Sequence, residues 1–81
     1  MVDIEVTPHF KKVFSKIKPF LRERILKQME KIKNNPEIGK PMMYTRKGTR
    51  ELYILHFRLS YSYIEEENKI VLLDLYHKDE Q

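Results

Sequence analysis

Three side chains near the end of the chain have the types that phosphodiester chemistry requires. Arg58 opens one strand-like run, and His77 and Lys78 close the next one. In an antiparallel meander the start of one strand lies beside the end of the strand that follows, so these residues are expected to meet at one end of a sheet. A permanent cation beside an imidazole can stabilise a charged phosphate and transfer a proton. The spacing therefore predicts a phosphodiester site at that sheet end.

Each of these residues also has a purely structural explanation. Arg58 can pair with Glu51 or Asp74 across the sheet, and an exposed pair of that kind contributes at most about 1 kcal/mol. A single histidine such as His77 is more often a solvated strand end than a catalytic group. No residue is specific when taken singly, and only the combination favours chemistry.

Alternation along residues 57–64 separates two sets of side chains, because successive residues of a strand point to opposite faces. One set is apolar or aromatic: Leu59, Tyr61 and Tyr63. The other set is polar: Arg58, Ser60 and Ser62. We expect the first set to pack against helices and the second to lie on an open face.

The last strand-like run, residues 70–78, is apolar on both faces. We expect its inner face to be formed by Val71, Leu73 and Leu75. Its open face would then carry Asp74, Tyr76 and Lys78. His77 would lie at the strand end, free to turn to either face.

Other kinds of site lack the residues they need. The three histidines are scattered and the chain has no cysteine, so no metal site is expected. Two glycines cannot form a phosphate-cradling loop, and the carboxylates show no paired acid and base. We therefore expect no cofactor, and any catalysis would rely on cations, an imidazole and hydroxyl groups.

Local signals predict one strand and two helices ahead of these runs. Alternating apolar residues predict a short strand over residues 2–6. Thr7 followed by Pro8 predicts the start of a first helix. The Lys18-Pro19 step ends that helix, because the residue before proline avoids the α region. A second helix follows and stops at an Asn-Asn-Pro sequence.

The remaining residues predict a loop and a meander. Residues 36–49 form the loop, with a short extended piece around residues 42–45. Gly48 is expected to turn the chain into the meander, and Asn68 to adopt a positive φ in its last turn. The element order is β-α-α-β-β-β. The sequence thus predicts a two-layer α+β fold with an N-terminal strand, a helical hairpin and a three-stranded antiparallel meander.

Length and charge give two further expectations. A chain of 81 residues is expected to form a single domain over residues 1–81, and no apolar run in it is long enough to span a bilayer, which favours the cytoplasm. Residues 11–35 carry nine Lys or Arg and two Glu, whereas residues 51–81 carry three basic and seven acidic residues. The basic helical hairpin is expected to attract polyanions.

Several short segments, taken in order, resemble the RelE/ParE superfamily of toxins from bacterial and archaeal toxin–antitoxin systems. They are Lys-Ile-Lys-Asn-Asn-Pro at 31–36, Gly-Lys-Pro at 39–41, Phe-Arg-Leu-Ser-Tyr at 57–61 and Leu-Tyr-His-Lys at 75–78. None is a strong motif alone, but the resemblance extends from Val2 to Lys78. It implies a compact RelE-like fold and a small antitoxin protein as partner.

The RelE-like branch implies a toxin that enters the ribosomal A site and cleaves mRNA by attack of the 2′-OH, without metal. In that resemblance Arg58 contacts the scissile phosphate, and His77 and Lys78 take the position of the acid or base. The basic hairpin is then expected to contact ribosomal RNA. Which of Tyr76, His77 and Lys78 transfers a proton is left open.

The same resemblance implies a set of substrate-binding residues. The loop before the meander supplies Arg46, Lys47 and Arg50, and the open face supplies Ser60 and Tyr76. An apolar rim at Met42, Met43 and Tyr44 is expected to accept an antitoxin helix.

Two other functions fit the resemblance. A ParE-like member inhibits DNA gyrase without catalysis, and a degenerate family member can persist as a non-toxic binding module. His77 favours the ribonuclease over the gyrase inhibitor.

Overall fold

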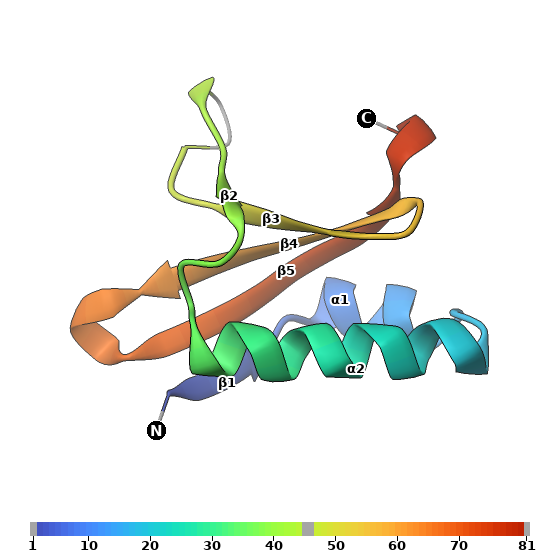
Figure 1. Cartoon of the computed structure of the whole chain (residues 1–81), viewed down its shortest axis with the longest axis horizontal. Coiled ribbons are helices and arrows are strands. Elements are labelled where there is room, and N and C mark those ends of the chain that lie inside the picture. Colours follow the sequence, from blue (N-terminus) through green and yellow to red (C-terminus); the bar gives the residue numbers. More distant parts are fainter. Residues whose placement is uncertain (1, 45–46, 81) are drawn as a thin grey trace.

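One mixed five-stranded sheet, covered on one face by two helices, forms the structure (Figure 1). The computed structural model describes residues 2–44 and 47–80. Its elements are β1 (Asp3–Val6), α1 (Pro8–Phe14), α2 (Pro19–Asn34), β2 (Lys40–Pro41), β3 (Arg50–Ile54), β4 (Phe57–Ile64) and β5 (Lys69–His77). Short 3₁₀ turns η2 (Glu65–Glu67) and η3 (Lys78–Glu80) flank β5. The predicted α+β class is confirmed, and the element order differs from the predicted β-α-α-β-β-β only by the added two-residue strand β2.

The strands lie in the order β1-β5-β4-β3-β2. Strands β3, β4 and β5 form the predicted antiparallel meander, and β1 pairs in parallel with β5 at one edge. At the other edge β2 pairs only Lys40 and Pro41 with β3. The extended piece predicted at residues 42–45 is therefore misplaced, since the strand precedes Met42, and Thr45 lies outside the described residues.

Both helices begin where the sequence predicts. The Thr7 hydroxyl accepts a 3.2 Å hydrogen bond from the Phe10 amide and so caps α1. Pro19 begins α2, whose inner side chains Leu21, Ile25 and Ile32 are buried in the core. Each fully buried side chain of this size contributes about 1.5–3 kcal/mol through removal of apolar surface from water.

The inner face of β4 is the predicted one. Leu59 and Tyr61 are fully buried and Tyr63 packs at the edge of the core. The Tyr61 hydroxyl donates to the Pro36 carbonyl at 2.7 Å and accepts from the Gly39 amide at 2.9 Å. Tyr61 therefore fastens the loop after α2 to the sheet.

The inner face of β5 differs from the prediction over half its length. Ile70 and Leu72 are fully buried, whereas Val71 and Leu73 are half-buried on the opposite side. The register explains this, because Ser60 pairs with Asp74 while the next residue, Tyr61, pairs with Leu72. Leu73 is thus an extra residue, a β-bulge that exchanges the two faces. Leu75, beyond the bulge, faces the core as predicted.

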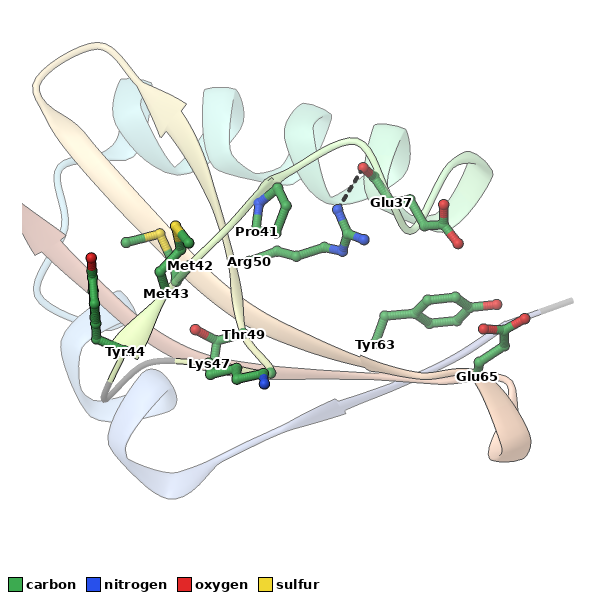
Figure 2. A pocket seen from close by; sticks show the side chains of 11 residues that line it. Glu37, Pro41, Met42, Met43, Tyr44, Lys47, Thr49, Arg50, Tyr63 and Glu65 are labelled. Carbon is green, nitrogen blue, oxygen red and sulfur yellow. Dashed lines mark hydrogen bonds between the residues drawn. The ribbon is translucent and has the colours of Figure 1, made fainter.

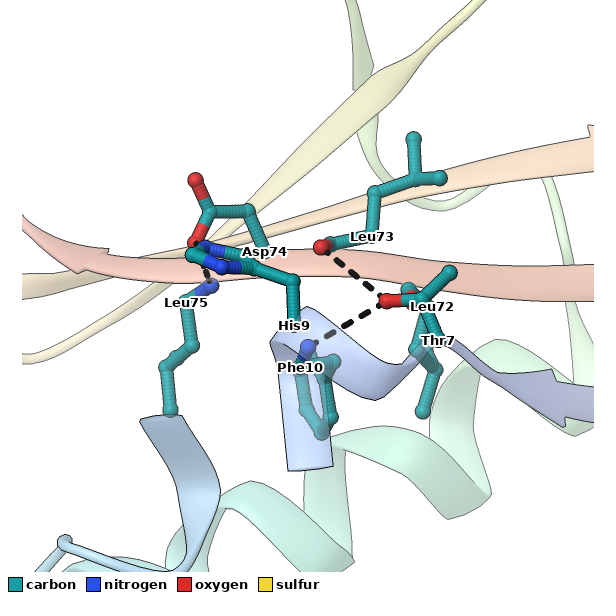
Figure 3. A network of polar contacts seen from close by, with 7 residues as sticks. All are labelled: Thr7, His9, Phe10, Leu72, Leu73, Asp74 and Leu75. Carbon is teal, nitrogen blue, oxygen red and sulfur yellow. Dashed lines mark hydrogen bonds and ion pairs between the residues drawn. The ribbon is translucent and has the colours of Figure 1, made fainter. Parts of the chain in front are cut away.

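Polar contacts with the start of α1 hold this bulge (Figure 3). The Thr7 hydroxyl donates to the Leu72 carbonyl at 2.9 Å. The Asp74 carboxylate accepts from the Leu75 amide at 2.7 Å and contacts His9 Nε2 at 2.9 Å. A single residue, Thr7, therefore caps a helix and also satisfies the bulged strand.

Candidate functional site

The face of the sheet away from the helices carries a cluster around Arg58. Cross-strand pairing places Arg58 between Tyr53 of β3 and Tyr76 of β5. The guanidinium carbon lies 3.8 Å from the centre of the Tyr53 ring, in the geometry of a cation–π contact. The loop before β3 and the η3 turn both rise on this side of the sheet (Figure 1). The predicted open face and the position of Arg58 on it are as expected from alternation.

Arg58 keeps unused capacity to donate hydrogen bonds. Its Nη1 donates to the Phe57 carbonyl at 3.2 Å, and its Nε is buried with no hydrogen-bond partner among the described residues. A buried unpaired donor is costly, so the site favours an added acceptor. A phosphate oxygen is an acceptor of that kind.

A buried carboxylate, which no motif of the sequence indicates as a functional group, completes the cluster. Glu51 is only 2% exposed although it lies on the open face, opposite Ser60. The Tyr76 hydroxyl donates a hydrogen bond to Glu51 Oε2. Alternation along residues 50–54 places Glu51 and Tyr53 on one face, which is the signal that could have identified it. The arrangement offers a carboxylate, a phenol and a guanidinium within three adjacent strands.

His77 lies at the same sheet end as Arg58 but on the other face. It pairs with Phe57, and its ring meets the Phe57 ring edge-on at 5.4 Å between centres. Its Nδ1 lies 3.4 Å from Asp79 Oδ2. Arg58 and His77 are therefore close only through their backbones. Their side chains lie on opposite faces of the sheet, because successive residues of a strand point to opposite sides.

Lys78 begins the η3 turn directly after β5. Its amide donates to the His56 carbonyl at 2.8 Å, and its side chain is exposed. Ser60 lies on the open face between Glu51 and Asp74, as its register requires. Both residues are thus placed where a ligand on the open face could reach them.

The basic residues before the meander lie in different surroundings. Arg50 pairs with Tyr61 on the helix side, and its Nη1 donates to the carbonyls of Glu37 at 3.0 Å and Gly39 at 2.8 Å. Lys47 is exposed, and Arg46 lies outside the described residues. Arg50 therefore has a structural role in holding the loop, in addition to any contact with substrate.

A cavity of about 610 Å³ opens between this loop and the ends of β3 and β4 (Figure 2). Met42, Met43 and Tyr44 lie at one end of it, and Tyr63 and Glu65 at the other. Met43 and Tyr44 are 70% and 88% exposed. The expected apolar rim is thus accessible to a partner.

Two kinds of feature are not found in the described residues. Over residues 2–44 and 47–80, no three His, Asp or Glu side chains are grouped as a metal site would require. No helix within these ranges has the length and apolar character needed to cross a membrane.

Comparison with known proteins agrees with the fold. A sequence profile of the ParE toxin of the type II toxin–antitoxin system parDE matches residues 4–81. No curated protein sequence matches the chain.

Several solved structures share the fold. The RelBE2 toxin–antitoxin complex of Mycobacterium tuberculosis has a TM-score of 0.86 at 20% identity, covering 94% of this chain and 96% of that one. The intact RelBE complex of E. coli has a TM-score of 0.83 at 15% identity, covering 95% and 96%. The RelE–RelB complex of Pyrococcus horikoshii OT3 has a TM-score of 0.80 at 14% identity, covering 99% and 98%. Because the profile matches residues 4–81, the chain belongs to the ParE toxin family of type II toxin–antitoxin systems, within the RelE/ParE superfamily.

Proposed function

We propose that this toxin is a metal-independent endoribonuclease that cleaves mRNA on the ribosome in the cytoplasm. The observation that supports the proposal is the cluster of Arg58, Tyr76 and Glu51 on the open face. A half-buried guanidinium with a spare donor suits the phosphorane, and a buried carboxylate joined to a phenol suits proton removal.

These contacts support the following cleavage step. The Tyr76 oxygen accepts the 2′-OH proton as the phenol proton passes to Glu51, so Glu51 gains one proton. The 2′-oxygen forms a bond to phosphorus, and Arg58 stabilises the negative charge of the resulting phosphorane. The bond from phosphorus to the 5′-oxygen then breaks. Lys78 on η3 supplies the proton for the leaving 5′-oxygen. The products are a 2′,3′-cyclic phosphate and a 5′-hydroxyl.

The partner side of the proposal concerns an antitoxin. The solved relatives cited above include complexes of toxin with antitoxin. The rim of Met42, Met43 and Tyr44 beside the cavity of about 610 Å³ offers adaptable apolar surface for an antitoxin helix. The basic hairpin leaves a cationic surface for ribosomal RNA.

Primer extension on mRNA from translating ribosomes tests the cleavage. Wild type is expected to produce cuts that Arg58→Ala reduces by at least about 100-fold, the order of loss seen when one preorganised charge-stabilising donor is removed. Lys69→Ala is the matched control, since it removes a cation at the opposite end of β5. Equal cutting by wild type and Arg58→Ala would remove Arg58 from the site.

A second candidate function has the family match in its favour. The matching profile is that of ParE, and the resemblance links ParE-like members to DNA gyrase. A supercoiling assay with purified gyrase separates the two: inhibition without mRNA cleavage would establish the gyrase inhibitor. Neither effect, with folded protein, would leave a non-toxic binding module.

A further inference from the structure

A second cavity, of about 380 Å³, lies at the end of the molecule where the α1–α2 turn meets the β3–β4 turn. Figure 1 shows these two turns at the same end. The lining residues include the aromatic groups Phe20, Phe57 and the imidazoles His56 and His77. His77, which the sequence placed with Arg58, therefore belongs to this cavity.

The cavity combines an apolar interior with a cationic rim. Ile17, Leu21, Leu55 and Phe57 supply the apolar wall, and Lys16 and Lys18 are exposed at its edge. No described lining residue is a carboxylate, although the Asp79 carboxylate lies 3.4 Å from Nδ1 of the lining residue His77. A ligand that is flat and apolar at one end and anionic at the other matches this distribution of charge.

The wall is held in place by its own contacts. Arg22 Nε donates to the Ile17 carbonyl at 2.9 Å, and its Nη2 donates to the Ser15 carbonyl at 3.0 Å, which fixes the turn that carries both lysines. The Asp79 amide lies 3.2 Å from His77 Nδ1, so Nε2 is the nitrogen that remains for a ligand. A site fixed before binding loses less entropy when the ligand arrives.

Two large apolar side chains at the mouth of this cavity are exposed to solvent. Phe20 is 59% exposed, and Leu55 is 54% exposed with a φ of 55°. A positive φ is unfavourable for leucine, so the surrounding turn must impose it. An exposed aromatic ring beside cations is the usual element of a base-stacking platform.

From these observations we infer that the cavity binds a nucleotide unit, with its base against Phe20 and the Phe57–His77 pair and its phosphate between Lys16 and Lys18. The unit can be a free mononucleotide or one residue of a single-stranded RNA. The site is on the opposite side of the sheet from Arg58, so its occupancy does not depend on cleavage.

Titrations followed by ¹⁵N–¹H NMR test the inference on the full chain. The probes are uridine and guanosine 5′-monophosphate, ribose 5-phosphate, inorganic phosphate and a single-stranded RNA decamer. Nucleotides are expected to shift the amides of the two turns, and ribose 5-phosphate is expected to bind about tenfold more weakly because it has no base to stack. Tighter binding of the decamer than of either nucleotide would identify RNA as the source; equal binding would identify the free nucleotide.

Matched variants locate the binding. Phe20→Ala is expected to weaken nucleotide binding about tenfold. Leu26→Ala, which removes another exposed apolar side chain of α2, 49% exposed against 59% for Phe20, is expected to leave it unchanged. Lys16→Gln with Lys18→Gln should also weaken it, whereas Lys40→Gln, which removes an exposed cation of β2, should not. Because Phe20 is exposed, its loss leaves the core intact.

Three results would overturn the inference. One is no shift at the two turns with any nucleotide, and another is equal binding of inorganic phosphate and nucleotide. The third is self-association that Phe20→Ala abolishes in the absence of nucleotide binding, which would assign the surface to a second copy. Arg58→Ala is measured in parallel: nucleotide binding that persists when cleavage is lost separates this site from the proposed ribonuclease.

Discussion

At the scale of single residues, the open face is defined by Arg58 and by the residues that pair with it from the two neighbouring strands. Tyr53 covers the guanidinium on one side and Tyr76 lies on the other. Tyr76 in turn connects the surface to buried Glu51. The two tyrosines flank one arginine but have different chemistry, since Tyr53 contributes its ring and Tyr76 its hydroxyl.

This difference gives a prediction for two conservative substitutions. Tyr76→Phe removes the hydroxyl that donates to Glu51, and it is expected to lower the mRNA cleavage rate by about 10²–10⁴-fold, the usual contribution of a general acid–base group. The loss of a hydrogen bond to a buried carboxylate is also expected to lower the free energy of unfolding by about 1–3 kcal/mol. Urea denaturation and single-turnover cleavage measure the two effects.

Tyr53→Phe is the control for that prediction. It keeps the ring beside Arg58 and is expected to change both quantities little. Similar losses in the two variants, or full activity in Tyr76→Phe, would exclude the proton relay through Tyr76.

Tyr61 permits a prediction on pH. Burial raises the pKa of the Tyr61 hydroxyl above its ordinary value of 10.0, and the hydrogen bond from Gly39 opposes that rise. Because the folded pKa is the higher one, the contribution of Tyr61 to stability is complete below pH 10 and is lost as pH rises through the folded pKa. We expect the free energy of unfolding of wild type to fall more steeply above pH 10 than that of Tyr61→Phe.

Urea denaturation of both proteins at pH values from about 8 to 11 measures this difference. The comparison of the two proteins isolates the contribution of this one hydroxyl group. Parallel stability curves for the two proteins would show that Tyr61 ionises equally in both states.

At the scale of elements, the bulge in β5 decides which side chains enter the core. One extra residue, Leu73, moves Leu72 to the inner face and keeps Leu75 there as well. The same shift determines that Asp74 and Tyr76 lie with Arg58 while His77 lies with Phe57. The bulge thus separates the candidate catalytic face from the cavity on the other side.

Substitution of two neighbouring leucines tests this arrangement. Leu72→Ala is expected to lower the free energy of unfolding by about 2–5 kcal/mol, because it leaves a void in the core. Leu73→Ala removes the same atoms from a half-buried position, and it is expected to cost at least 1 kcal/mol less, at roughly 1–2 kcal/mol. Urea denaturation of the two variants gives the comparison, and a larger loss in Leu73→Ala would mean that the strand pairs in the uninterrupted register.

At the scale of the whole molecule, charge is divided between the two layers. The helical layer is basic, whereas residues 51–81 carry seven acidic and three basic residues, with Glu65, Glu66 and Glu67 together in η2. A molecule with this asymmetry is attracted to a polyanion through its helices, and the attraction weakens with salt.

Salt dependence is the measurement that belongs to this scale. Lys27→Gln combined with Lys31→Gln is expected to weaken binding to ribosomes and to reduce the slope of log Kobs against log salt by about one to two. Glu65→Gln combined with Glu66→Gln is the matched control, and it is expected to leave the slope unchanged or to increase it slightly. Sedimentation with ribosomes over a series of salt concentrations gives both slopes; an unchanged slope in the lysine variant would exclude the hairpin as the contact.

Much of the fold follows from short stretches of sequence. The Thr7-Pro8 start, the Lys18-Pro19 break and the positive φ of Asn68, 50°, depend on a few adjacent residues. The inner face of β4 follows from period-two alternation in the same way. Because these features depend on local conformation and local hydrogen bonds, the sequence by itself determined them.

The candidate site required information that no local pattern contains. Only tertiary structure decided that Leu73 is an extra residue, because a bulge depends on the partner strand and on Thr7, which is 65 positions from Leu72. The bulge gives Ile70 and Leu72 the core positions that the sequence assigned to their neighbours. It also follows from pairing across strands that Arg50 holds a loop and that Glu51 is buried beside Tyr76. Alternation names the residues that share a face, but long-range pairing decides which of them meet.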